Sequence, residues 1–139
     1  MKVYISGKIT GYDLKVAEAK FNESEEFLRL KGFHPINPFK LSETHQDKTW
    51  KDYMIDDIRW LFDCDAIYLH NDWWQSKGAR IEYQIAKELN LKVMFADEFL
   101  NLNDNVSAMS SGGFGTTLTI RASVINILLK KITINNTSN

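Results

Sequence analysis

Two carboxylates fall on the apolar stripes of predicted helices. In the run 53–62, Asp57 lies three residues after one apolar position and four before another on the same helical face. In the run 78–89, Glu82 has the same three-and-four spacing. We therefore expect both side chains to point inward. Burying an ionised carboxylate without a partner is costly, so two such residues indicate a polar pocket that uses them.

Composition limits the classes of protein that fit this chain. With 139 residues we expect one main domain, and 17 basic against 18 acidic side chains give a formal net charge of -1. This balance argues against binding a nucleic-acid polymer or a membrane surface through bulk charge. The single cysteine, Cys64, excludes an internal disulfide and is expected to be a small buried thiol. No secretory signal follows Met1, so we expect a cytoplasmic protein.

Strand and helix patterns alternate along the chain. We expect strands at 2–6, 33–36, 66–69 and 92–96, helices at 13–31, 53–62 and 76–90, and a loop at 38–48. Short apolar strands that alternate with helices predict an α/β fold in which a parallel sheet is covered by helices on both faces. In such sheets the ligand binds outside the carboxyl ends of the strands. We expect four segments to meet there: 7–11, 37–38, 70–75 and the start of the helix that holds Glu82.

The start of the helix 76–90 has the features of an anion site. Backbone N–H groups near Gly78 and Ala79 would point into the crevice, and Ser76 is a plausible N-cap. Lys77 and Arg80 could add positive charge, so a phosphate would fit here.

Other candidate motifs are weaker. The GKITG segment at 7–11 lacks the upstream glycine of a phosphate-binding Walker loop, and a structural turn remains an alternative to a binding role. Trp73 and Trp74 fit a base-stacking wall as well as a hydrophobic lid. The histidines show no metal-ligand spacing and are expected to be ordinary surface or loop residues: His34, His45 and His70. We therefore expect neither a metal nor another cofactor.

A further set of residues forms a recognisable pattern: YISG at 4–7, Gly11, Asn37-Pro38, Trp50, Asp57, Asp65 and WQSKGARIE at 74–82. This pattern resembles a family of small phage and bacterial proteins of unknown function, DUF4406. That family is similar in turn to the nucleoside 2-deoxyribosyltransferases and the 2′-deoxynucleoside 5′-phosphate N-hydrolases. The resemblance covers residues 1 to 96. It implies a Rossmann-like parallel sheet, a homo-oligomer, and cleavage of an N-glycosidic bond in a small nucleotide or nucleoside.

The resemblance also implies roles for individual residues. Glu82 matches the nucleophile, Asp57 the acid that assists the departing base, and Tyr4 the tyrosine that positions the nucleophile. Ser76 stands six residues before Glu82, as in the hydrolases that act on 5′-monophosphates. The residues expected to contact the substrate are Ser6, Gly7, Lys8, Ile9, Gly11, Asn37, Trp74, Ser76, Gly78, Ala79 and Arg80.

This chemistry is physically reasonable for two carboxyl groups. A carboxylate can attack the anomeric carbon of a deoxyribosyl group, while a second carboxyl gives a proton to the base. A different class of function stays open, because the bulky Arg80 would also suit a module that binds a nucleotide without turning it over.

The last part of the chain, 101–139, lies beyond the resemblance. Residues 101–117 are rich in Asn, Ser and Gly and read as a linker, and 118–134 form an apolar segment with interspersed basic residues. We expect that segment to complete the sheet or to dock on a second subunit rather than to lie on a membrane.

Overall fold

The computed structural model describes residues 1–42 and 47–98 of the chain. The chain divides into two compact units, Met1–Phe99 and Leu100–Asn139. The second unit lies outside the described residues, and so does the predicted linker and apolar segment at 101–139.

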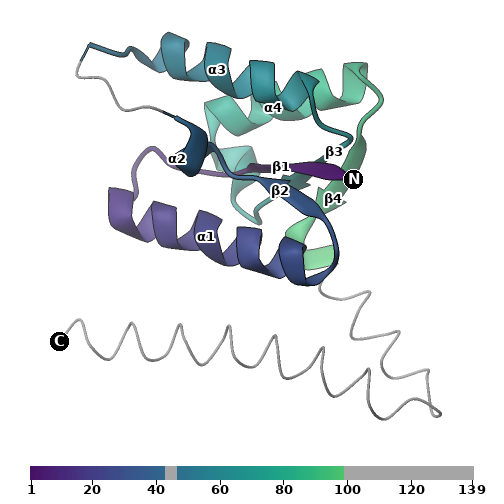
Figure 1. Ribbon diagram of the computed structural model, residues 1–139. Helices are drawn as coiled ribbons and strands as arrows, with labels where there is room; N and C mark the ends of the chain where they lie inside the picture. The colour runs from purple at the N-terminus through teal and green to yellow at the C-terminus, as the bar shows by residue number, and fades with distance from the viewer. Residues whose placement is uncertain (43–46, 99–139) are drawn as a thin grey trace, which may run out of the picture. The chain divides into compact units, whose positions relative to one another are not determined.

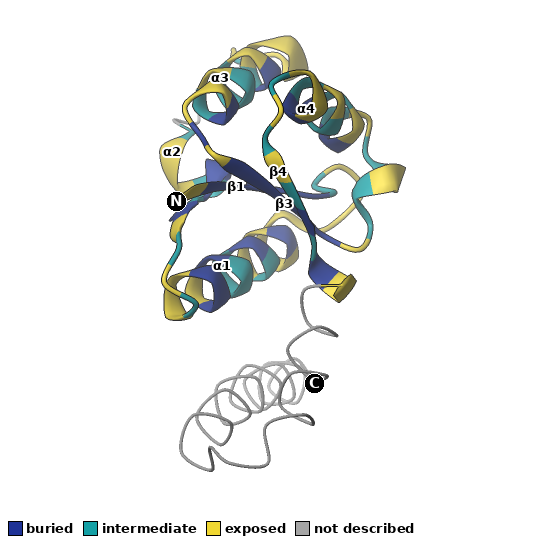
Figure 2. Ribbon diagram, turned by 90° about the vertical axis from the view of Figure 1, so that its right-hand side faces the viewer, coloured by how far each residue is buried: buried dark blue, intermediate teal, exposed yellow. Residues whose placement is uncertain are grey.

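A parallel sheet forms the centre of the first unit. In the described residues its strands are β1 (Lys2–Ser6), β2 (His34–Ile36), β3 (Ala66–Leu69) and β4 (Lys92–Phe95), in the order β2-β1-β3-β4. Every neighbouring pair is parallel. Figures 1 and 2 show helix α1 (Leu14–Leu30) on one face and helices α3 (Trp50–Phe62) and α4 (Lys77–Glu88) on the other. The predicted α/β, Rossmann-like fold with helices on both faces is confirmed.

The crossovers set the place of the ligand crevice. The chain leaves β1 toward α1 on one face of the sheet, whereas it leaves β3 toward α4 on the other face (Figure 1). Because β1 and β3 are neighbours in the sheet, their two connections diverge at the carboxyl ends. Divergence of this kind opens a crevice at the edge of a parallel sheet.

Capping side chains fix where the helices begin. Thr49 and Asp52 form a reciprocal capping box, so α3 begins at Trp50, three residues before the run expected from periodicity. The predicted loop at 38–48 is wrong at its start, because a short helix, α2, occupies Pro38–Leu41. Proline suits the first helical position, and the Asn37 side chain accepts the Phe39 N–H as its N-cap.

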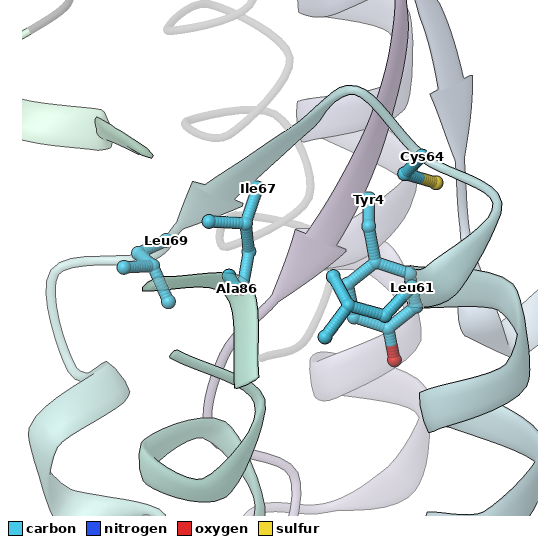
Figure 3. Close-up of a cluster of buried hydrophobic side chains, with 6 residues drawn as sticks. All are labelled: Tyr4, Leu61, Cys64, Ile67, Leu69 and Ala86. Carbon is cyan, nitrogen blue, oxygen red and sulfur yellow. The ribbon is translucent and has the colours of Figure 1, made fainter. Parts of the chain in front are cut away.

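Hydrophobic side chains are buried on both faces of the sheet, and α1 contributes Ala17, Phe21 and Leu28. Figure 3 shows the cluster on the side of α3 and α4, which consists of Tyr4, Leu61, Cys64, Ile67, Leu69 and Ala86. The prediction that Cys64 is a small buried thiol is confirmed, since the residue is 6% exposed. Among the described residues, no helix has the length and apolar character needed to cross a membrane.

The histidines were expected on the surface or in loops. His70 lies in the loop after β3, but it is buried there, and its ring packs edge-on against Phe21 with the centroids 4.7 Å apart. The glycine at position 7 makes room for it, because a Cβ there would lie 2.3 Å from the His70 Nδ1 atom. His34 is exposed as expected, while His45 falls outside the described residues.

Candidate active site

A cavity of about 370 Å³ opens at the carboxyl ends of the strands. This volume lies within the range of small-molecule binding sites. Its walls come from β1 and the segment after it, and from the helices α1, α2, α3 and α4. The lining residues are Tyr4, Ile5, Ser6, Gly7, Ile9, Thr10, Leu14, Phe21, Pro38, Phe39, Ser42, Trp50, Tyr53, Met54, Asp57, Ser76, Gly78, Ala79 and Glu82.

Glu82 is held on the cavity wall by two hydroxyl groups. Its side chain projects from the second turn of α4 and the residue is 5% exposed. The Tyr4 hydroxyl donates to Oε1 at 2.9 Å, and the Ser6 hydroxyl donates to Oε2 at 2.5 Å. Tyr4 and Ser6 are two residues apart on β1, so they share one face of the strand. Both carboxylate oxygens therefore have a fixed orientation.

Asp57 stands on a different wall of the same cavity, on α3. Burial raises the pKa of Asp57 to about 7, with a further contribution from the negative charge of Asp56 that Lys48 partly offsets. Burial also raises the pKa of Glu82 to about 8, and the charge of Asp57 adds to this effect. The bonds from Ser6 and Tyr4 act in the opposite direction but do not cancel it. The two carboxyl groups thus form a coupled pair that holds a proton near neutral pH.

A third buried carboxylate provides a contrast. Glu25 is also 5% exposed, but it forms ion pairs with Arg29 and Lys40, each at 2.8 Å, and accepts the Asn37 amide at 2.9 Å. Burial would raise its pKa, yet these bonds outweigh burial and lower it. No cation contacts the carboxylate of Glu82 in the part of the chain that the structure describes. A buried carboxylate without a compensating cation is more typical of an active site than of a structural ion pair.

The sequence reasoning missed part of the cavity wall. Trp50, Tyr53 and Met54 lie seven, four and three residues before Asp57, and all four line the cavity. These spacings place them on one face of α3. The periodicity that directed attention to Asp57 could have found the aromatic residues as well.

Several of the predicted substrate-binding residues are placed in the cavity wall. They are Ser6, Gly7, Ile9, Ser76, Gly78 and Ala79. The structure places five others outside the lining: Lys8, Gly11, Asn37, Trp74 and Arg80. Asn37 is engaged elsewhere, because its oxygen caps α2 and its amide nitrogen donates to Asn22 and Glu25. Gly11 adopts a φ of +92°, a backbone conformation that favours glycine, so this residue is needed for the turn without any contact to a ligand.

The predicted phosphate site is only partly assembled around the start of α4. The Ser76 hydroxyl caps the helix by accepting the Ala79 N–H at 3.2 Å. Arg80 is exposed and donates to the Trp74 carbonyl at 2.7 Å, and the Lys77 ammonium lies 4.9 Å from the centroid of the Trp50 ring. Trp50 lines the cavity, so Lys77 lies next to its wall. Lys48 does so as well, since its ammonium lies 4.5 Å from the centroid of the lining Tyr53 ring. Among the described residues, no group of three or more His, Cys, Asp or Glu side chains could hold a metal ion.

Comparison with known proteins gives one match for this region. A family model described as Domain of unknown function (DUF4406) matches residues 1–95. All the residues that line the cavity fall within that match. The search among curated proteins found no match to the chain.

Proposed function

Since the chain belongs to the DUF4406 family, and the matched residues contain the whole cavity, we propose that this site is an N-glycosidase centre. Its proposed substrates are 2′-deoxynucleoside 5′-monophosphates in the cytoplasm. The observation that carries the proposal is the buried Glu82, with both oxygens bonded by hydroxyl groups and Asp57 facing the same cavity. Glu82 is the nucleophile, Asp57 the acid, and Tyr4 the residue that orients the nucleophile.

The proposed reaction has two steps. A Glu82 oxygen attacks the anomeric carbon of the deoxyribosyl group, the bond from that carbon to the base nitrogen breaks, and the electron pair leaves with the base. Asp57 gives its proton to the base. Water then attacks the same anomeric carbon, the bond from that carbon to the Glu82 oxygen breaks with its electron pair returning to the carboxylate, and Asp57 accepts the proton from the water. The products are the free base, the 2-deoxyribose phosphate and the regenerated carboxylate.

The carboxyl pair must be in one protonation state for the reaction, with Glu82 ionised and Asp57 protonated. Burial raises the pKa of both groups, so near neutral pH the pair holds a proton that either carboxyl can carry. A positive charge developing on the sugar would favour the ionised form of Glu82 in the transition state.

The second candidate function is a module that binds a nucleotide without cleaving it. It is favoured by the cavity lining, which carries no Lys, Arg or His side chain among the described residues, and by the engagement of Arg80 with Trp74. A site that holds its ligand mainly through apolar contacts to the base would show this composition.

The deciding experiment measures release of free base by chromatography. The full chain is incubated with each deoxynucleoside 5′-monophosphate and with the parent nucleosides, beside Glu82→Gln and Glu88→Gln. Glu88 is an exposed carboxylate on the same helix, so its variant is the matched control. We expect wild type and Glu88→Gln to release base, and Glu82→Gln to be slower by about 10³-fold or more.

Two results would change the proposal. Tight binding of a nucleotide in calorimetry without release of base would replace the enzyme by the binding module. Equal affinity for a nucleoside and its monophosphate would remove the phosphate from the substrate, because charge-assisted bonds to phosphate should favour the nucleotide. The homo-oligomer also stays a proposal, and light scattering against the chain mass of 16.1 kDa tests it.

A further inference from the structure

We propose that Asp72 is a positioning residue that fastens the segment 7–12, and with it one wall of the cavity, to the loop after β3. Asp72 does not line the cavity. It acts through the backbone of a segment that does. The kinetic part of its test depends on the proposed function, whereas the structural part does not.

Donors from three points of the chain converge on this one carboxylate. Its Oδ1 atom accepts the Lys8 backbone N–H at 3.3 Å. Its Oδ2 atom accepts the Tyr12 hydroxyl at 2.8 Å and the Lys20 ammonium at 2.5 Å. Lys8 and Tyr12 lie near the two ends of the segment, and Lys20 lies on α1, so Asp72 ties both ends to one point.

The surrounding groups support the same arrangement. The ammonium groups of Lys8 and Lys20 lie 5.2 and 5.4 Å from the centroid of the Tyr12 ring. The Lys8 ammonium also donates to the Gln75 side chain at 3.2 Å, which adds a second bond to the region after β3. Inside the segment, the Tyr12 N–H donates to the Ile9 carbonyl at 3.2 Å and closes a turn.

The segment between the two attachment points forms part of the cavity wall. Ile9 and Thr10 both line the cavity, and both lie between Lys8 and Tyr12. The Asp72 side chain is only 12% exposed, so solvent screens its ion pair less than that of a surface aspartate. Burial disfavours its ionised form, but the bonds from Lys20 and Tyr12 outweigh burial and lower its pKa. The attachment therefore stays charged at neutral pH.

Hydrogen exchange of the backbone amides tests the attachment directly. In Asp72→Ala we expect the amides of residues 8–12 to exchange about tenfold faster or more, while those in the middle of α1 keep their rate. Asp72→Asn keeps the oxygen that accepts the Lys8 N–H, and its NH2 group can donate to the Tyr12 hydroxyl, but the bond from Lys20 is lost. This variant should therefore restore part of the protection. Asp63→Ala is the matched control, because Asp63 also pairs with a lysine, at 2.7 Å, but at the opposite edge of the sheet.

Steady-state kinetics then tests whether the attachment by Asp72 affects substrate binding in the cavity. If the full chain releases base, Asp72→Ala should raise KM about tenfold and leave kcat within about threefold, since the wall that meets the ligand is loosened and the carboxyl pair is intact. Asp72→Asn should return KM toward the wild-type value.

Three outcomes separate the explanations. Unchanged exchange in residues 8–12 of a folded Asp72→Ala overturns the proposal, and so does faster exchange with an unchanged KM. If wild type releases no base, the exchange result still decides the attachment while the proposed function fails separately. If Asp72→Ala does not fold, Tyr12→Phe replaces it, because it removes one hydroxyl from the same carboxylate and should speed exchange in the same residues.

Discussion

Replacing Glu82 by glutamine should make the protein more stable at alkaline pH while it abolishes the proposed chemistry. The folded chain holds Glu82 with a pKa of about 8 against an ordinary value of 4.5, because burial penalises its charge. A raised carboxyl pKa means that the folded state binds a proton more tightly than the unfolded state does. Stability is therefore greatest below the ordinary pKa and falls as the pH rises through the folded one.

The size of the effect follows from the two pKa values. Each unit of difference corresponds to about 1.4 kcal/mol, and most of the titration lies between about pH 5 and about pH 9. Over that interval the wild type should lose up to about 4 kcal/mol of unfolding free energy through Glu82 alone. Glutamine has nearly the same volume and can bond to both Tyr4 and Ser6, but it has no charge to bury.

Denaturant titrations and thermal melts of both proteins across this pH range provide the assay. The two melting temperatures should lie close together near pH 5, and the variant should melt about 10 °C or more above the wild type near pH 9. Glu25→Gln is the control of opposite sign. Its lowered pKa stabilises the fold above the ordinary value, so that variant should be less stable than the wild type at neutral pH. Equal losses of stability in wild type and Glu82→Gln would refute the reasoning, because Glu82 would then carry no uncompensated charge.

Three further predictions concern the same region. Rate measurements across the pH range should show a bell-shaped profile of base release, centred between about pH 7 and about pH 8. Asp57→Asn should remove the alkaline limb of that profile and should slow the release of poor leaving groups most. Tyr4→Phe should raise the pKa of Glu82 further by removing one of its two donors, which would move the acidic limb of the profile to higher pH. Gly7→Ala should destabilise the fold by about 2 kcal/mol or more in chemical denaturation, because its Cβ would meet the buried His70 ring at 2.3 Å.

The sequence predicted the sheet well because each strand is a short apolar run between clear breaks. The first and third strands have the expected bounds, and the other two differ by one residue. The short helix α2 was missed because four residues are too few to show a helical period. Pro38 was placed at the start of a loop, whereas it begins this helix.

The site shows what periodicity can and cannot predict. The three-and-four spacing predicted a buried Glu82, which is confirmed, and Asp57 lines the same cavity although it is less buried. Glu25 lies four residues after Phe21 and three before Leu28, which also places it on an apolar face, so an inward carboxylate is not specific to a functional site. The difference comes from the cations that neutralise Glu25, and Lys40 reaches it from a separate helix. Only a folded chain reveals such a partner.

The buried thiol of Cys64 is a built-in probe of how often its part of the fold opens. The sulfur donates to the Trp60 carbonyl at 3.2 Å, and burial raises the pKa of the thiol to about 11, so the folded protein offers almost no reactive thiolate at neutral pH. A thiol reagent should therefore label the chain only as fast as the region around Cys64 opens. Because the chain has a single cysteine, all of the labelling reports on that region. Cys64 precedes β3, at the edge of the sheet opposite the cavity. A compound that slows its labelling must reduce the opening of the region around Cys64, whereas one that orders only the cavity wall leaves the labelling rate unchanged.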